Sequence, residues 1–134
     1  MKGLYAIEIS AVVKELQFLA GSKLSKIYEP DKNEIVLAFH TPGEGRSLLR
    51  IVSGVCMYLS GKKKKSPLKP YSFCLFLRKR LQNSVLKSVE QKRFERIVEF
   101  KFSTKDKEYL LIVELFSKGN IVCSAMKIIK FSLR

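Results

Sequence analysis

The sequence is poor in the residues that build most catalytic and metal centres. Its one histidine, His40, has no cysteine or serine motif to suggest a catalytic triad. The three cysteines, Cys56, Cys74 and Cys123, are widely spaced without a CxxC pair, which argues against a zinc site. All three lie in apolar runs, as reduced core cysteines usually do. We therefore expect no metal, no cofactor and no covalent chemistry, and so a protein that is not an enzyme.

Long hydrophobic runs are also missing. No apolar stretch approaches the roughly 20 residues that a helix needs to cross a bilayer, and the N-terminus lacks the features of a signal peptide. Together with reduced cysteines, these absences predict a cytoplasmic location. The 134 residues, 46% hydrophobic and 28% charged, have the length and composition of one globular domain.

Acidic residues are scarce. The chain has twelve aspartates and glutamates but 26 lysines and arginines, which gives a formal net charge of +14. An excess of this size favours a polyanionic partner, namely nucleic acid, an anionic membrane or an acidic protein, and the alternative is a surface that only keeps the protein soluble. Because no apolar run can span a bilayer, we expect no membrane among these partners.

Two clusters concentrate the positive charge. The first lies in the polar loop 61–67 and consists of Lys62, Lys63, Lys64 and Lys65. Lysines in a loop can follow a phosphate backbone without reading the bases, although many such runs are simply solvated. The second cluster includes Arg78 and Lys79, whose side chains leave a helix about 100° apart. At most part of the second cluster can therefore face one ligand.

The apolar residues alternate between helical and strand spacing. Val12, Val13, Leu16 and Leu19 predict a helix over residues 10–19, with Ser10 as its N-cap and Gly21 as its end. A second helix is predicted over 71–82. Short apolar or alternating runs between turn residues predict strands joined by hairpins, over 23–28, 34–39, 47–52, 55–59, 85–90, 97–102, 109–116 and 121–123.

The two halves of the chain look alike. Sliding the sequence along itself until Ser10 lies on Ser72, which we call the repeat shift, also pairs Leu19 with Leu81, Ser22 with Ser84, Leu24 with Leu86, Ile35 with Ile97, Val36 with Val98, Leu48 with Leu110 and Leu49 with Leu111. Either this is a chance similarity or the halves, roughly 1–61 and 67–134, repeat one unit of a helix and four strands. Because neither unit can bury its apolar face alone, we expect an α+β domain. Its predicted form is a helix-capped antiparallel β-sandwich or flattened barrel.

An ordered set of local motifs resembles the N-terminal domain of the NFACT family. The motifs are Ile7-Glu8-Ile9, the segment 21–30 (GSKLSKIYEP), Pro70 with 73–79 (FCLFLRK), Gln91 with 94–98 (FERIV), 111–116 (LIVELF) and 118–121 (KGNI). This family includes nuclear export mediator factor and the bacterial proteins called fibronectin-binding protein A. Each motif alone is weak, but together they cover almost the whole chain in the expected order.

The resemblance implies a fold similar to the N-terminal domain of formamidopyrimidine-DNA glycosylases. It also implies a function in which the protein binds the obstructed large ribosomal subunit and tRNA and supports tailing of the stalled nascent chain. The later family domains are absent from this sequence, so either it is a domain excised from a longer protein, or it is a short gene product with a separate chain that carries those domains as a further partner. The alternative is a DNA-binding or DNA-repair domain, but Met1-Lys2-Gly3 does not supply the N-terminal proline that those glycosylases use as nucleophile.

The resemblance also implies a site. The acidic residue ahead of the first helix in the family matches Glu8, and the acidic–arginine pair matches Glu95 and Arg96. The family usually has aspartate at both acidic places, so the longer glutamates are a departure. We expect Glu95 and Arg96 to begin a strand with their side chains on opposite faces. Two carboxylates there could orient an arginine, a ribose hydroxyl or a tRNA amine, and the alternative is an ordinary ion pair.

Overall fold

The computed structural model describes residues 6–31, 34–52, 56–60, 72–93, 95–115, 120–125 and 130–132, and describes side chains only between 7 and 115, Ser72 excepted. The elements in chain order are α1 (Ala6–Glu15), the 3-10 turn η1 (Leu16–Leu19), β1 (Lys23–Asp31), β2 (Glu34–Thr41), β3 (Gly45–Val52), β4 (Cys56–Ser60), α2 (Ser72–Leu81), β5 (Val85–Gln91), β6 (Ile97–Ser103), β7 (Glu108–Glu114), β8 (Asn120–Ala125) and β9 (Lys130–Ser132). None of the helices in these ranges is long and apolar enough to span a membrane.

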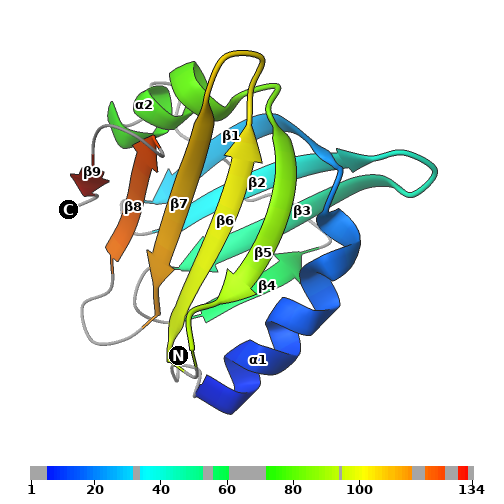
Figure 1. The fold of residues 1–134 in the computed structure, drawn as a ribbon, viewed down its shortest axis with the longest axis vertical. Coiled ribbons are helices and arrows are strands. Elements are labelled where there is room, and N and C mark those ends of the chain that lie inside the picture. The colour runs from blue at the N-terminus through cyan, green and yellow to red at the C-terminus, as the bar shows by residue number, and fades with distance from the viewer. Residues whose placement is uncertain are drawn as a thin grey trace.

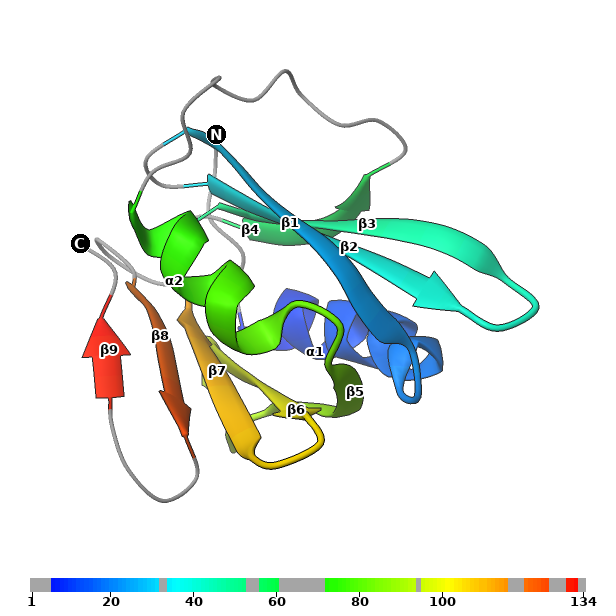
Figure 2. The ribbon, with the colours of Figure 1, turned by 90° about the horizontal axis from the view of Figure 1, so that it is seen from above.

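The strands form one antiparallel sheet in the order β4-β3-β2-β1-β5-β6-β7-β8-β9. Most neighbouring strands pair along their length, but β1 and β5 share a single register pair, Lys23 with Val85. The sheet folds over at this narrow seam, and β1–β4 and β5–β9 become two layers that face each other (Figure 2). The predicted α+β class and antiparallel layers are therefore confirmed.

The seam itself shows the internal repeat. Four backbone hydrogen bonds join the halves: Gly21 N to Leu86 O (2.7 Å), Asn83 N to Leu24 O (2.7 Å), Leu24 N to Ser84 O (2.8 Å) and Leu86 N to Ser22 O (2.9 Å). Exchanging each residue for its partner under the repeat shift turns the first bond into the second, and the third into the fourth. The seam is thus symmetric under the shift that the sequence suggested.

Each helix packs on the first strand of the other half. Helix α1, from the first half, lies along β5 and contacts β4, and α2, from the second half, lies along β1. Polar side chains fix both contacts: Gln17 Nε2 donates to Val89 O at 2.8 Å, and Arg78 Nε donates to Ile27 O at 3.0 Å. The two acceptors, Ile27 and Val89, are again partners under the repeat shift. This exchange of helices locks the halves together.

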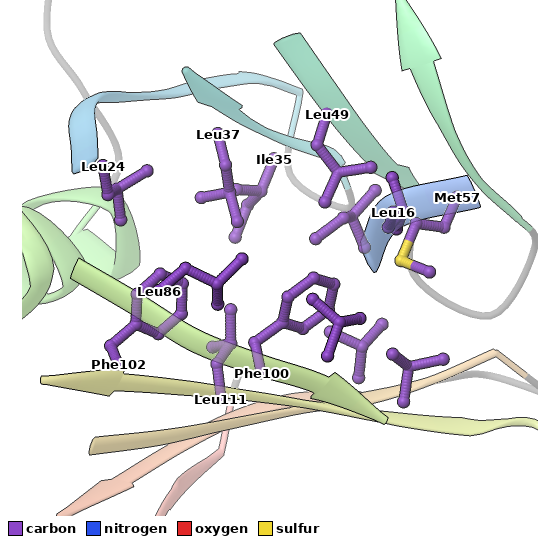
Figure 3. Close-up of a cluster of buried hydrophobic side chains, with 14 of the residues drawn as sticks. Leu16, Leu24, Ile35, Leu37, Leu49, Met57, Leu86, Phe100, Phe102 and Leu111 are labelled. Atoms are coloured by element: carbon purple, nitrogen blue, oxygen red, sulfur yellow. The ribbon is translucent and has the colours of Figure 1, made fainter. Parts of the chain in front are cut away.

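The core lies between the two layers. On β2 the inward residues Ile35, Leu37 and Phe39 are fully buried. Across from Ile35 and Leu37, Phe100 and Phe102 of β6 are buried as well (Figure 3). The rings of Phe39 and Phe102 are nearly parallel, with centroids 6.3 Å apart. Burial of each large apolar side chain stabilises the fold by about 1.5–3 kcal/mol. Burial alternates along β6, whereas β2 is buried on both faces, since Val36 and Ala38 are fully buried as well.

The first helix differs from its prediction. It begins at Ala6 instead of residue 10, so Ser10 lies inside α1 and is not an N-cap. Ile9 is fully buried and extends the apolar stripe of Val13 and Leu16 one turn toward the N-terminus. The last predicted turn is a 3-10 turn ending at Leu19. The second predicted helix is confirmed to within one residue at each end.

All eight predicted strands are present, with two corrections. Strand β9 was not predicted, so the second half has five strands instead of four. The repeat shift is also wrong for β2. Leu24 pairs with Phe39, whereas its repeat partner Leu86 pairs with Phe102, which is one residue beyond the position that the shift assigns to Phe39. Val98, and not Ile97, therefore takes the buried place that corresponds to Ile35.

The cysteine interpretation holds where side chains are described. Cys56 and Cys74 are buried thiols. Burial raises the pKa of both, which keeps them protonated and poorly nucleophilic. The side chain of Cys123 lies outside the described part of the structure.

Candidate nucleic-acid interface

Glu8 lies in the first turn of α1, not ahead of the helix as expected, and it is exposed. The helix begins early because Ile9 is buried against the core, and this places the Glu8 carboxylate near the unpaired N–H groups of the helix start. The positive end of the helix dipole stabilises an acid at such a position. An acidic residue at position 8 is therefore stabilised by the helix itself, whether or not a ligand binds there.

Glu95 and Arg96 lie in the connection between β5 and β6 instead of beginning a strand. The inference that their side chains leave opposite faces of a strand is therefore wrong. Hydrogen bonds hold the backbone of this connection: Lys92 N to Ile97 O (2.9 Å), Glu95 N to Lys92 O (3.2 Å), Gln91 Nε2 to Glu95 O (2.6 Å) and Leu115 N to Arg96 O (2.8 Å). Both side chains are exposed. A fixed backbone thus presents a carboxylate and a guanidinium to solvent.

The elements that carry these three residues lie at the same end of the domain (Figure 1). Contacts along the chain support this placement. Gly21 bonds to Leu86 near the start of β5, and Gln17 bonds to Val89 further along the same strand. The chain preceding Gln17 therefore runs toward the end of β5, where residues 92–96 begin. A direct approach of the Glu8 carboxylate to the Glu95 and Arg96 side chains stays a prediction.

The second basic cluster lies elsewhere, because α2 occupies the opposite end of the molecule (Figure 1). Arg78 is half-buried and bonded to Ile27 O, so its guanidinium holds the helix on β1. The guanidinium carbon of the neighbouring Arg80 lies 3.7 Å from the Phe76 ring centroid. Lys79 between them is exposed. Lys62, Lys63, Lys64 and Lys65 fall outside the described residues.

A buried acid, Glu29, was not among the predicted residues. Glu29 is 4% exposed, and its Oε1 accepts a hydrogen bond from the Cys74 amide at 3.0 Å. A side chain from β1 thereby caps the first turn of α2. Burial raises the pKa of the Glu29 carboxyl from 4.5 to about 7, although the hydrogen bond from Cys74 acts in the opposite direction. Its inward position, two residues after Ile27, was the signal in the sequence.

Comparison with known proteins identifies the family to which the chain belongs. Residues 6–131 match the family model of NFACT N-terminal and middle domains. The chain is 38% identical over 121 residues to "Archaeal Rqc2 homolog aRqcH" of Methanocaldococcus jannaschii, covering 87% of this chain and 18% of that protein. It is 31% identical over 117 residues to "Ribosome quality control complex subunit NEMF" of Homo sapiens, covering 87% and 11%.

Solved structures agree. The N-terminal domain of fibronectin-binding protein PavA from Streptococcus pneumoniae superposes with a TM-score of 0.85 at 26% identity, covering 91% of this chain and 49% of that one. The N-terminal part of the fibronectin/fibrinogen-binding protein of Streptococcus suis gives the same TM-score at 27% identity, with the same coverage.

By its fold, the two-layer antiparallel sheet with exchanged helices, the chain is similar to the N-terminal domains of fibronectin-binding proteins. The chain belongs to the NFACT family, and the resemblance seen in its motifs is confirmed. It spans about a fifth or less of the length of the curated relatives it matches.

Proposed function

We propose that this chain is the RNA-contacting N-terminal module of a cytoplasmic ribosome quality-control factor. In this role it contacts tRNA and the obstructed large ribosomal subunit and supports tailing of the nascent chain. The observation that carries the proposal is the match of residues 6–131 to the NFACT family, with relatives named as ribosome quality control complex subunits in human and in Drosophila melanogaster.

Charge supports RNA as the ligand. A net charge of +14 on 134 residues creates a strong positive field, and contacts between lysine or arginine and phosphate supply most of the sequence-independent affinity for nucleic acids. Affinity from this source falls steeply as salt rises, because each contact releases condensed counterions. Weak, salt-dependent binding is therefore the expected behaviour of this chain alone.

We propose further that the protein binds and positions RNA without covalent chemistry. The two cysteines with described side chains are buried, and their raised pKa values keep them protonated. The buried Glu29 carboxyl is engaged with the Cys74 amide. Peptidyl transfer remains with the ribosome in this scheme. The likeness of the fold to the N-terminal domain of formamidopyrimidine-DNA glycosylases is part of this proposal, without the chemistry of those enzymes.

Glu8, Glu95 and Arg96 form the proposed recognition site. The first turn of α1 and the β5–β6 connection lie at the same end of the domain (Figure 1), and four hydrogen bonds hold the connection. A rigid backbone limits the conformational entropy lost when exposed side chains grip a ligand. Two carboxylates and a guanidinium can together orient a ribose hydroxyl or an amine by charge-assisted hydrogen bonds.

Binding of fluorescently labelled tRNA, measured by anisotropy over a range of salt concentrations, tests the proposal. We expect Kd to rise with salt, and Arg96→Ala to weaken binding more than Lys105→Ala, an equal loss of charge in the β6–β7 turn. Glu8→Ala should likewise exceed Glu15→Ala, its control at the other end of α1. No binding at low salt, or an affinity independent of salt, would refute the module. If each variant weakens binding no more than its matched control, the proposed recognition site is refuted.

Borohydride treatment with abasic DNA separates the alternative of DNA repair. We expect no covalent adduct, because the described residues offer no activated nucleophile. A trapped adduct on the intact chain would show glycosylase-type chemistry instead of binding alone.

A further inference from the structure

A row of basic side chains crosses three strands on the outer face of the first layer. The register pairs Lys23 of β1 with His40 of β2, and His40 with Arg46 of β3. Their chain neighbours Leu24 and Phe39 are fully buried in the core. Because successive side chains in a strand point to opposite faces, Lys23, His40 and Arg46 point outward, and all three are exposed.

The same face continues with a further cation and an aromatic ring. Lys26 is exposed and pairs with Ala38, and Tyr28 is half-buried and pairs with Val36. Ala38 and Val36 are themselves fully buried, so the accessible groups here are the long side chains on the flanking strands. Arg46 Nη2 donates a hydrogen bond to the Tyr28 hydroxyl at 3.2 Å. Since β2 lies between β3 and β1 in the sheet, the Arg46 side chain crosses β2 to reach Tyr28. The guanidinium and the phenol are thus held together over the middle strand.

The acidic residues near this face lie mostly away from the cationic row. Asp31 is exposed at the far end of β1, where it pairs in register with Glu34. Glu34, at the other end of β2, forms an ion pair with Arg50, and both residues are buried. Glu44 is exposed in the turn between β2 and β3. That hairpin projects from the body of the domain in both views (Figures 1 and 2). The described part of the face near the hairpin therefore carries an excess of positive charge at an accessible edge.

From this arrangement we propose that the outer face of β1–β3 binds the phosphate backbone of single-stranded RNA. Lys23, Lys26 and Arg46 would contact phosphates, and Tyr28 would offer a ring for a base. The strands of a sheet are about 4.8 Å apart, so these cations spread over roughly 10 Å across three strands. Exposed sheets that combine cations with aromatic rings are a recurring way to bind unpaired nucleotides, because every base has a face that can stack.

Charge and shape favour RNA over a lipid surface. The large hydrophobic side chains that are exposed in the described part of the chain are Ile7, Phe18, Tyr58, Leu59 and Leu75, and none of them lies on β1–β3. The proposed surface therefore lacks the large apolar groups that insert into a bilayer. The inference rests on the proposed function, since it takes RNA as the ligand. It adds a second surface, distinct from the end of the domain where Glu8, Glu95 and Arg96 lie.

The test uses the intact chain and a short single-stranded RNA of mixed sequence. We compare wild type, the triple variant Lys23→Gln/Lys26→Gln/Arg46→Gln, and a control that loses the same charge on the other layer, Lys101→Gln/Lys105→Gln/Lys107→Gln. Circular dichroism and melting temperature monitor folding of each protein. If three phosphate contacts are lost, the slope of log K against log salt should become shallower by about 2. We expect about tenfold weaker binding for the first triple variant, and a smaller loss for the control.

Two further outcomes separate the hypotheses. If both triple variants weaken binding equally, only overall charge matters and the surface on β1–β3 is refuted, whereas RNA binding stands. If wild type does not bind RNA even at low salt, both the surface and the proposed function fail. Tyr28→Phe keeps the ring but removes the hydroxyl that accepts from Arg46. It should therefore weaken binding less than Tyr28→Ser, and the reverse order would contradict a stacking role.

Discussion

Replacing Glu29 by glutamine should stabilise the protein at pH 8 and have little effect at pH 5. The Glu29 carboxyl is buried between β1 and α2, where its Oε1 accepts the hydrogen bond from the Cys74 amide. Glutamine has nearly the same volume and keeps an acceptor oxygen for that amide. The substitution therefore removes the ionisable proton and preserves the cap of α2.

The direction follows from the raised pKa. Between pH 4.5 and about 7 the folded protein holds the Glu29 proton more tightly than the unfolded chain does. The contribution of Glu29 to stability is therefore greatest below pH 4.5, falls as the pH rises toward 7, and stays lower by a constant amount above it. At 1.36 kcal/mol per pKa unit, ionisation of Glu29 lowers the free energy of unfolding by up to about 3 kcal/mol. Glutamine avoids this loss.

Urea unfolding at pH 5 and pH 8, at one ionic strength, measures the effect. The gain in unfolding free energy from Glu29→Gln should be larger at pH 8 than at pH 5 by about 1–3 kcal/mol. Glu90→Gln, at an exposed position on β5, is the matched control and should give the same small value at both pH values. An equal effect of Glu29→Gln at the two pH values would refute the assignment of a buried, proton-binding carboxyl.

Two further predictions concern the joints between the halves. Gly21 has φ +90°, and an added Cβ would meet no atom within 4 Å, so Gly21→Ala should cost about 1–2 kcal/mol from backbone conformation alone. Asn83, the partner of Gly21 under the repeat shift, has φ 70° and should tolerate glycine without loss, and thermal melting of both variants checks the pair. Arg78→Ala should destabilise by about 1 kcal/mol because it removes the donor to Ile27 O. Lys79→Ala should stay within about 0.5 kcal/mol in urea unfolding; equal effects would refute the structural role of Arg78.

Local periodicity predicted most of the elements but not how they meet. Leu16 and Leu19 indicated the first helix, yet its start was missed because Ile9 was not included in the apolar stripe. The three-residue strand β9 is too short to give a periodic signal. The seam between β1 and β5 depends on residues far apart in the sequence, and only the repeat hinted at it. The repeat shift then failed along β2, where one strand connection is a residue longer than its counterpart.

The candidate site depended on a different kind of information. Glu8, Glu95 and Arg96 came from the family resemblance, since no local pattern shows that α1 packs along β5. Glu29 was overlooked because its burial depends on α2 lying across β1. The cross-strand row of Lys23 and Arg46 is not visible in the order of residues along the chain, because neighbours in a sheet are set by strand register.

The exchange of helices between the halves has a consequence for biosynthesis. When residues 6–60 have left the ribosome, β1–β4 are complete, but α2 and β5–β9, which cover their apolar face, have not been made. At about 5–20 residues per second, the rest of the domain follows several seconds later. During that interval Ile35, Leu37 and Phe39 have no opposite layer to pack against. The nascent first half therefore exposes apolar side chains that chaperones can bind. The domain can reach its native state only after α2 and β5–β9 have been translated.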